Sequence, residues 1–189
     1  MNMHDALTES LRASPVVMKN GYPYFIHPIT DGVPAMDPKI LREVVDWMKS
    51  AGDFDCDVIL APESMGIPLA VPVSLDLGIP YSVVRKKKYG LPGEIAFEQK
   101  TGYSDSTMTI NGVRKGDRVV IVDDVLSTGG TMSALIRALR DNIGAVIVDV
   151  LVPVNKNHGR DIVKKNTGIE VKTMVDVSMV DGKVQCKTC

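Results

Sequence analysis

Two neighbouring acids, Asp123 and Asp124, stand between an apolar run and a stretch of small polar residues. The apolar run, residues 119–122, has four branched side chains in succession, the pattern of a strand buried on both faces of a parallel sheet. From Met132 onward the apolar residues recur at helical spacing. The sequence therefore predicts a strand, a polar turn and a helix N-terminus, where free backbone N–H groups and the helix dipole favour an anion.

The residue types in this turn indicate a ligand that is part phosphate and part polyol. The turn consists of Ser127, Thr128, Gly129, Gly130 and Thr131. Its hydroxyl groups are donors, and its glycines let the backbone approach an anion closely. Asp123 and Asp124 would repel a phosphate, so they suit the vicinal hydroxyls of a ribose or a hydrated divalent metal ion. A sugar phosphate lying across the turn satisfies both halves, whereas acids that merely cap a helix explain only the Asp-Asp pair.

The ordered string of apolar strand, two acids and Thr-Gly-Gly-Thr loop resembles the phosphoribosyl pyrophosphate signature of the type I phosphoribosyltransferases. It is most similar to purine enzymes of the adenine and archaeal hypoxanthine/guanine branches, over residues 24–160. The resemblance implies that Asp123 and Asp124 hold the ribose hydroxyls and Mg²⁺, directly or through water. Residues 127–131 would hold the 5′-phosphate. It also implies an α/β fold with a central, mostly parallel sheet flanked by helices, a small hood and a flexible lid.

Length and composition are consistent with this fold class. The chain has 189 residues, 44% of them hydrophobic, and a formal net charge of −1. We expect one domain over residues 1–189, with a hood formed by residues 14–36 and 153–189 and a lid formed by residues 86–110. No charge excess favours nucleic acid or a membrane, and no signal or membrane-spanning run is evident, so a cytoplasmic protein is expected.

A second strand, turn and helix precedes the signature. The apolar run 58–61 leads into Glu63, Ser64, Met65 and Gly66, and a helix is predicted over residues 67–77. In the family this loop binds pyrophosphate and often holds a cis peptide; adenine enzymes usually have Asp-Ser-Arg-Gly there. A further strand, residues 80–84, delivers Arg85, Lys86, Lys87 and Lys88. Beside two phosphate loops, these cations are interpreted as pyrophosphate ligands, although a run of charges is often only solvated.

Residues 89–106 are rich in glycine and polar residues and lack a helical period, which predicts an irregular, mobile lid. The family resemblance implies that this lid closes over the reaction centre and excludes water. Glu98 is the nearest acid in this lid. A hairpin back to the central strand is expected for residues 107–110 and Val113, turning at residues 111–112.

The predicted base contacts lie in the hood. Tyr24 and Phe25 are either core residues or, as the family likeness implies, rings that stack on a purine. Lys156 follows a predicted strand over residues 145–153, at the sheet end where such folds bind ligands. A lysine there can donate to a 6-oxo group, although a surface lysine is the alternative. Val125, directly after the two acids, completes the expected base contacts.

Further elements follow from local signals. Residues 1–14 suggest a helix, and Asp37 caps a second helix that ends at Gly52. A helix is expected over residues 160–166 and a last strand over residues 170–176, followed by a surface hairpin or tail. The three cysteines are too few for a disulfide framework, and the pair Cys186 and Cys189 does not complete a zinc site.

The implied reaction joins a purine nitrogen to C1 of phosphoribosyl pyrophosphate and releases pyrophosphate, with Asp123, Asp124 and Glu98 as the catalytic candidates. Animal hypoxanthine/guanine enzymes carry an aspartate general base where this chain has Ser127, so the proton acceptor stays open. A 6-oxopurine is the first expectation, with adenine or xanthine as alternatives. A ligand-sensing regulator and an orotate enzyme fit less well. The resemblance also implies a homodimer.

Overall fold

The computed structural model describes residues 5–19, 21–100 and 105–189. The helices are α1 (Asp5–Arg12), α2 (Pro28–Asp31), α3 (Pro38–Ala51), α4 (Gly66–Leu77), α5 (Gly130–Arg137), the π-helical segment η1 (Ala138–Ile143) and α6 (Gly159–Thr167). The strands are β1 (Val16–Lys19), β2 (Tyr22–Phe25), β3 (Val58–Pro62), β4 (Tyr81–Val84), β5 (Ile95–Lys100), β6 (Asp105–Ile110), β7 (Arg118–Val122), β8 (Val125–Leu126), β9 (Val146–Leu151), β10 (Val154–Lys156), β11 (Val175–Val180) and β12 (Lys183–Thr188).

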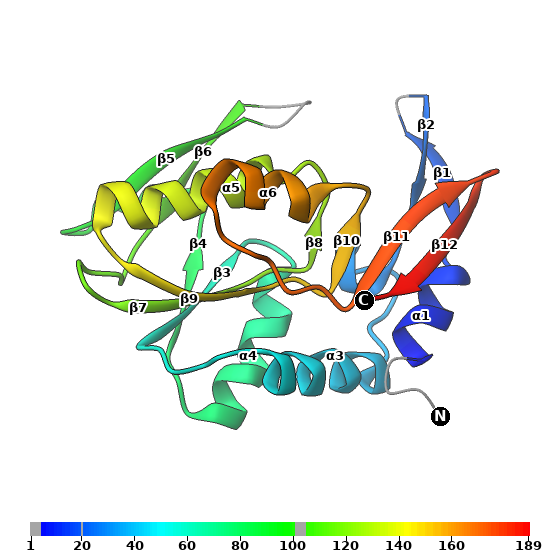
Figure 1. The fold of residues 1–189 in the computed structure, drawn as a ribbon, viewed down its shortest axis with the longest axis horizontal. Helices are drawn as coiled ribbons and strands as arrows, with labels where there is room; N and C mark the ends of the chain where they lie inside the picture. Colours follow the sequence, from blue (N-terminus) through cyan, green and yellow to red (C-terminus); the bar gives the residue numbers. More distant parts are fainter. Residues whose placement is uncertain (1–4, 20, 101–104) are drawn as a thin grey trace.

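A parallel sheet in the order β4-β3-β7-β9 forms the centre of the fold. Helices α3 and α4 lie on one side of it, and α5 and α6 lie on the other (Figure 1). Residues 119–122 of the central strand β7 have no exposed surface. The predicted α/β fold and the doubly buried strand are therefore confirmed.

Alternation along the strands divides the core into two clusters. On β3, Ile59 points with Val44 and Leu69 toward α3 and α4. Its neighbour Leu60 points with Leu135 toward α5 on the opposite face. Because burial of each such side chain is worth about 1.5–3 kcal/mol, both helix layers are held by the apolar strands that the sequence encodes.

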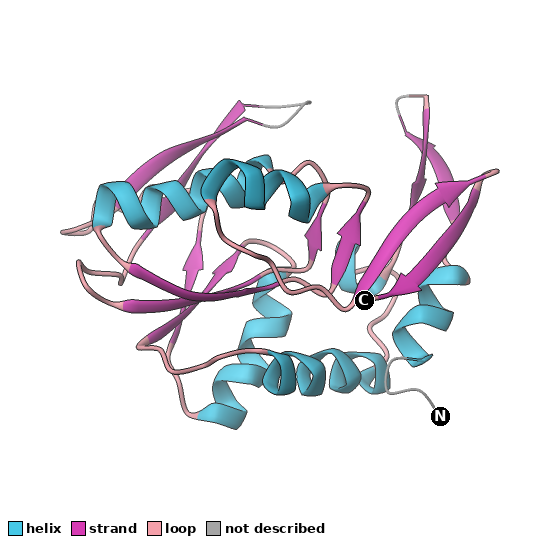
Figure 2. Cartoon of the chain, viewed as in Figure 1, coloured by secondary structure: helices cyan, strands magenta, loops and turns pink. Residues whose placement is uncertain are grey.

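A second sheet, in the order β12-β11-β10-β8, adjoins the central one and belongs to the hood except for β8 (Figure 2). Strand β8 follows Asp124 directly and pairs in parallel with β10. The signature acids therefore lie at the junction of two sheets. The last strand does not cover residues 170–176 as expected: β11 begins at Val175, and Lys172 makes only a single bridge with Leu151.

The predicted N-terminal helices are present. Asp37 caps α3 by accepting a hydrogen bond of 2.8 Å from the N–H of Lys39, and Gly52 ends the helix. Helix α1 packs against α3 and β12, although residues 1–4 of the expected first helix lie outside the described residues. No described helix is both long enough and apolar enough to cross a membrane.

The lid is more regular than the sequence suggests. Strands β5 and β6 form an antiparallel ribbon, so the prediction of an irregular segment is wrong. The side chains alternate along β5: Phe97 pairs with Met108 and is buried with it against α5, whereas its neighbour Glu98 is exposed. Residues 111–112 do not turn a hairpin onto the central strand, because β6 pairs with β5 and β7 pairs with β3 and β9. The segment 101–104, also part of the expected lid, lies outside the described residues.

Candidate active site

The two signature acids are held by the backbone of three strands. Asp123 ends the buried run of β7, and its N–H donates to the carbonyl of Leu151 on β9 at 3.1 Å. The carbonyl of Asp124 accepts a hydrogen bond of 3.3 Å from the N–H of Val154 at the start of β10. The acids therefore sit at the carboxyl end of the parallel sheet, where open α/β sheets bind their ligands.

Burial makes this pair electrostatically unfavourable in its fully ionised form. It raises the pKa of Asp123 to about 6, although a hydrogen bond with Asp124 offsets part of the effect. Burial also raises the pKa of Asp124, and the negative charge of Asp123 raises it further. Hydroxyl donors or a cation at this point would relieve the repulsion.

The acid pair fits Mg²⁺ better than it fits a closed protein metal centre. Within the part of the chain that the structure describes, no group of three or more His, Cys, Asp or Glu residues could hold a metal ion. Magnesium is usually held by one or two carboxylates together with water and substrate phosphates. Asp123 and Asp124 are such a pair of hard oxygen ligands.

The turn after the acids leads into the N-terminus of α5. Gly129 precedes the helix with φ of +68°, and no described side chain caps the first turn. The first N–H groups of α5 are therefore available to an anion, together with the exposed hydroxyl groups of Ser127 and Thr128. Gly130 and Thr131 form the first turn of the helix.

Helix α6 packs against residues 127–131, the predicted phosphate turn. The sequence did not indicate this contact. A Cβ on Gly129 would lie 2.7 Å from the carbonyl oxygen of Gly159. A Cβ on Gly159 would in turn lie 2.9 Å from Cβ of Leu126 and 3.0 Å from the carbonyl oxygen of Ser127. In the sequence, the only signal for this contact was Gly159, which directly precedes the helix predicted over residues 160–166.

The second predicted loop meets the first at Gly66. A Cβ on Gly66 would lie 2.9 Å from the carbonyl oxygen of Val122 and 3.2 Å from Oδ1 of Asp123. The peptide between Glu63 and Ser64 is cis, the feature that the family likeness implied. This arrangement places the loop 63–66, the predicted pyrophosphate loop, directly beside the acids.

The side chain of Met65 leads from this loop to the hood. A Cβ on Gly32 would lie 3.1 Å from Sδ of Met65. Met65 thus occupies, between loop and hood, the position at which adenine enzymes usually carry arginine. The loop supplies no cation of its own at this position.

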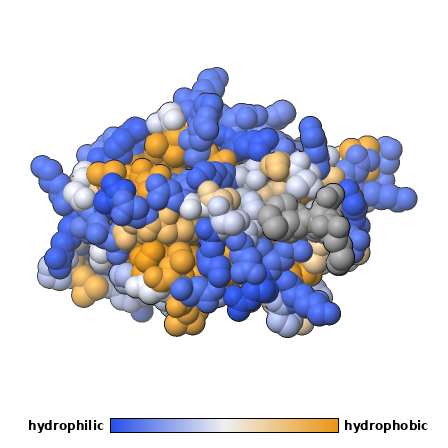
Figure 3. Space-filling view, turned by 60° about the horizontal axis from the view of Figure 1, so that its bottom comes forward, coloured by the Kyte–Doolittle hydropathy of each residue, from blue (hydrophilic) through white to orange (hydrophobic). Residues whose placement is uncertain are grey.

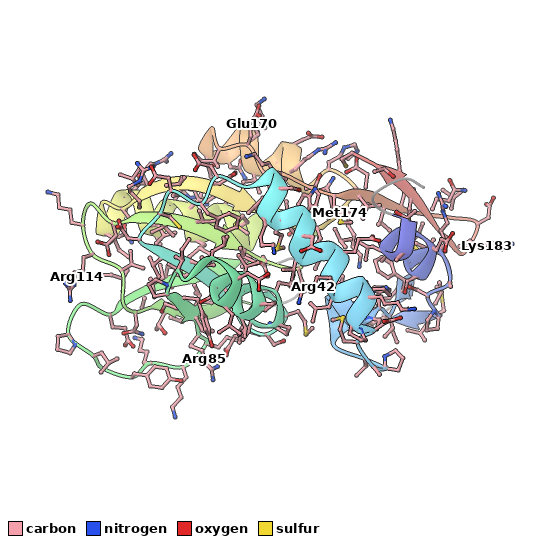
Figure 4. All side chains as sticks on the ribbon, turned by 90° about the horizontal axis from the view of Figure 1, so that it is seen from below. Arg42, Arg85, Arg114, Glu170, Met174 and Lys183 are labelled. Carbon is pink, nitrogen blue, oxygen red and sulfur yellow. The ribbon has the colours of Figure 1, made fainter. Side chains whose placement is uncertain are left out.

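The basic run is attached to the same loop. Arg85 Nε lies 2.9 Å from Glu63 Oε2, and the N–H of Lys86 donates to Glu63 Oε1 at 2.7 Å. In Figure 4, Arg85 points outward at the edge of the molecule beside α4, away from Arg42 on α3. Arg85 is half-buried, whereas Lys87 and Lys88 are exposed. Glu63 therefore orients the guanidinium group of Arg85 and the backbone of Lys86, and its own charge makes its side chain unsuited to contact pyrophosphate.

The lid ribbon is attached to the basic run through Thr109. The hydroxyl group of Thr109 donates to the carbonyls of Arg85 and Lys87, at 3.2 and 2.9 Å. Glu98 is exposed on β5, next to the buried Phe97, and no described contact joins it to another predicted site residue. Its catalytic role stays a prediction.

Three predicted base contacts come together in the hood. The ammonium group of Lys156 lies 4.0 Å from the ring centroid of Phe25 and 4.6 Å from that of Tyr24. The two ring planes are inclined by 15°. Val125 belongs to β8, which pairs with β10 two residues before Lys156. The lysine is thus a member of this cluster rather than a surface residue.

Asp31 joins this cluster, and sequence reasoning missed it. It accepts hydrogen bonds from the hydroxyl groups of Tyr24 and Thr30, both at 2.6 Å, and from the N–H of His27 at 3.1 Å. Burial favours a higher pKa for Asp31, but these bonds and the charge of Lys156 lower the pKa below its ordinary value. Neither spacing nor residue type distinguished Asp31 from a surface acid.

The charge of the acid pair influences the pKa values of the hood cluster, which consists of Tyr24, Phe25, Asp31 and Lys156. Burial lowers the pKa of Lys156, while the charges of Asp31 and Asp124 oppose that shift. Burial and the bond to Asp31 raise the pKa of Tyr24, and the charge of Asp124 raises it further. The charge of Asp124 therefore acts on both Tyr24 and Lys156.

Comparison with known proteins agrees with this arrangement. The profile of the phosphoribosyl transferase domain matches residues 38–182. The hypoxanthine/guanine phosphoribosyltransferase of Methanobacterium lacus is 49% identical over 97% of this chain and 96% of its own. That of Methanohalophilus mahii is 50% identical over 96% of this chain and 95% of its own.

Among solved structures, the adenine phosphoribosyltransferase of Thermoanaerobacter pseudethanolicus superimposes with a TM-score of 0.72 at 26% identity. The match covers 89% of this chain and 99% of that one. Domain profile, relatives and fold agree with the geometry of the acid pair and the two loops. The chain therefore belongs to the phosphoribosyltransferase family and has its type I fold.

Proposed function

We propose that this protein transfers the phosphoribosyl group of phosphoribosyl pyrophosphate to hypoxanthine or guanine, giving the nucleoside monophosphate and pyrophosphate. The observation that carries the proposal is the contact of Gly66 with Asp123, since it joins an acid pair for the ribose to a loop for the pyrophosphate. The extensive identity with hypoxanthine/guanine enzymes supports the choice of base.

The site residues divide the substrate among them. Asp123 and Asp124 accept hydrogen bonds from the ribose hydroxyl groups, and residues 127–131 bind the 5′-phosphate at the N-terminus of α5. The loop 63–66 and the cations 85–88 bind the pyrophosphate. Tyr24, Phe25, Val125 and Lys156 receive the base. Holding both ends of the sugar leaves C1 as the atom free to move between leaving group and base.

Breaking the bond between C1 and the pyrophosphate oxygen leaves positive charge on the ribose and negative charge on the departing group. Arg85 and the lysines that follow it stabilise the negative charge, and the acid pair lies on the side where positive charge grows. Mg²⁺, held beside Asp123 and Asp124, would supply further charge neutralisation on the pyrophosphate. Once closed over the reacting atoms, the lid ribbon limits hydrolysis of the activated sugar.

Base recognition rests on the donor character of Lys156. Its ammonium group can donate to the 6-oxo group of hypoxanthine or guanine, whereas the 6-amino group of adenine is itself a donor. Glu98 is our candidate for the proton acceptor because it belongs to the lid. Its exposed position requires the lid to close before it can act.

The direct test is release of pyrophosphate with Mg²⁺, phosphoribosyl pyrophosphate and each of hypoxanthine, guanine, xanthine and adenine in turn. Turnover with hypoxanthine and guanine is expected. Turnover with adenine alone would contradict the choice of base, and it is the outcome that the matched adenine enzymes would favour. Absence of turnover with every base would contradict the enzymatic function.

We also propose that the protein acts as a homodimer in the cytoplasm, where its charged, water-soluble substrates are found. Large apolar side chains are exposed at the edge of the central sheet: Leu75 is 78% exposed, and Leu77 and Tyr81 are also exposed. The largest hydrophobic area in Figure 3 lies in the half of the molecule that holds α4 and β4. Light scattering of the wild type and of Leu75→Lys should distinguish a dimer from a monomer.

A further inference from the structure

The aromatic surface that the base needs is already occupied. Phe25 is buried as part of the core cluster that includes Leu7, and the ammonium group of Lys156 lies 4.0 Å from its ring centroid and 4.6 Å from that of Tyr24. A purine can stack on a ring face only if no other group covers it. Entry of a base therefore requires the ammonium group to leave the rings.

The rings are fixed more firmly than the lysine. Tyr24 is held by its hydrogen bond to Asp31, and Asp31 is itself held by Thr30 and by the N–H of His27. No described hydrogen bond or ion pair holds the ammonium group of Lys156. The long lysine side chain is thus the part that yields when a base enters.

We propose that Lys156 is a gate that selects the base, a role that rests on the proposed function. In the free protein its ammonium group takes the place of the purine on Tyr24 and Phe25, and a base binds by displacing it. A base with an acceptor at C6 gives the displaced ammonium group a hydrogen bond. Adenine loses the cation–π contact without replacing it, and discrimination arises at this exchange.

A plain donor role and a gate make different predictions for adenine nucleotides. If Lys156 only donates to a 6-oxo group, its removal weakens the binding of inosine monophosphate and leaves the binding of adenosine monophosphate unchanged. If Lys156 also occupies the rings, its removal makes adenosine monophosphate bind more tightly. The nucleotides are suitable probes because their ribose phosphate is held by the acid pair and the loop 127–131.

The experiment measures the affinities of both nucleotides and of ribose 5-phosphate by calorimetry for the wild type and Lys156→Met. We expect inosine monophosphate to bind more weakly, but by less than the full value of the lost charge-assisted hydrogen bond, because it too no longer has to displace the ammonium group. Adenosine monophosphate should bind about 2- to 30-fold more tightly, the range of a cation–π contact. Ribose 5-phosphate should bind as in the wild type.

Lys19→Met is the matched control. The ammonium group of Lys19 lies 4.9 Å from the ring centroid of Tyr24, but the residue is exposed and has no contact with Phe25 among the described cation–π pairs. This variant removes a cation from Tyr24 alone, so it should increase the affinity for adenosine monophosphate less than Lys156→Met does and should leave that for inosine monophosphate unchanged. An equal gain for adenosine monophosphate in both variants would contradict the gate and point to general electrostatics.

The remaining outcomes separate the two proposals. If Lys156→Met binds inosine monophosphate more weakly and adenosine monophosphate as the wild type does, the gate is overturned and the proposed function stays intact. Unchanged affinities for both nucleotides would show that Lys156 lies outside the base site and would overturn the gate together with the assigned base contacts. Loss of ribose 5-phosphate binding would contradict our separation of Lys156 from the sugar site.

A measurement on the unmodified protein provides a second test. In lysine-labelled protein the methylene group beside the Lys156 ammonium should give a ring-shifted NMR signal, identified by its absence in Lys156→Arg. Saturation with inosine monophosphate should move this signal to the ordinary lysine region. A signal that keeps its ring shift with the nucleotide bound would overturn the gate.

Discussion

Glu63 Oε2 lies 2.9 Å from Arg85 Nε, while its other oxygen accepts a hydrogen bond of 2.7 Å from the N–H of Lys86. One carboxylate in the pyrophosphate loop thereby orients the first two residues of the basic run. A carboxylate, which would itself repel pyrophosphate, thus positions the start of the basic run that we propose binds it.

Two substitutions separate the two roles of Glu63, which accepts a hydrogen bond from Lys86 and forms an ion pair with Arg85. Glu63→Ala removes both and should raise KM for phosphoribosyl pyrophosphate about 5-fold, the effect of losing roughly 1 kcal/mol of partly exposed, charge-assisted contact. Glu63→Gln keeps an acceptor for Lys86 and should show a smaller rise. Glu170→Gln, which alters the exposed pair with Lys164, is the control. Tighter substrate binding by Glu63→Gln would contradict the positioning role.

The raised pKa of Asp123, about 6, predicts that the acid pair destabilises the folded protein above that pH. In the unfolded chain the carboxyl has its ordinary pKa, about 3.9. The folded state therefore keeps its proton longer, and the free energy of unfolding falls as the pH rises from about 4 to about 6. Asp123→Asn should remove this fall and raise Tm at pH 8 by a few degrees.

The same substitution should lower kcat/KM about 10-fold or more, because a charged acceptor for the ribose is lost. Thermal melts at pH 4 and pH 8, together with turnover, check both parts. At pH 4 the two proteins should have similar stability. A variant that is less stable than the wild type at pH 8 would show that the carboxylate stabilises the fold.

His27 predicts a pH dependence of opposite sign. It is buried in the hood, where Nδ1 accepts from the N–H of Ile29 and Nε2 contacts the hydroxyl group of Ser10. Burial lowers the pKa of His27 to about 4. The unfolded chain, with a pKa of about 6.5, takes up the proton first, so the free energy of unfolding falls as the pH drops from about 6.5 to about 4.

His27→Asn keeps an acceptor for Ile29 and should flatten the pH dependence of stability in this range. Denaturant titrations at several pH values measure the difference from the wild type. His158→Asn is the control, since His158 is exposed and its nearest acid, Asp161, is exposed as well. An unchanged slope in His27→Asn would mean that His27 is not the group that titrates.

The contact of Gly129 with Gly159 predicts that the phosphate turn tolerates no side chain. Gly129→Ala combines a left-handed φ of +68° with a Cβ placed 2.7 Å from a carbonyl oxygen, so the turn must shift and ribose 5-phosphate binding should be lost. Gly168→Ala has a similar φ of +78° with open space around the Cβ. Both should lose about 1 kcal/mol of stability from the backbone, but only the first should lose the ligand. Calorimetry with ribose 5-phosphate distinguishes them.

The sequence by itself determined the elements whose cause is local. Four branched apolar residues before Asp123 produce a buried strand, and the glycines and hydroxyls after Asp124 produce an open helix N-terminus, because both depend on neighbours in the chain. Asp37 and Gly52 bound α3 for the same reason. The lid ribbon also has a local signal, because apolar and polar residues alternate around Phe97. The many glycine and polar residues around it favoured an irregular segment instead.

Only the tertiary structure decided how the site is assembled. The contacts of Lys156 with Phe25, of Gly159 with Gly129 and of Glu63 with Arg85 join segments that are distant in the chain or lie on different strands. They depend on how the hood and α6 pack against the sheet. No spacing rule relates such residues, because their separation in the chain does not determine their separation in space. Residue types therefore indicated a sugar phosphate, while packing determined which groups gather at the proposed base site.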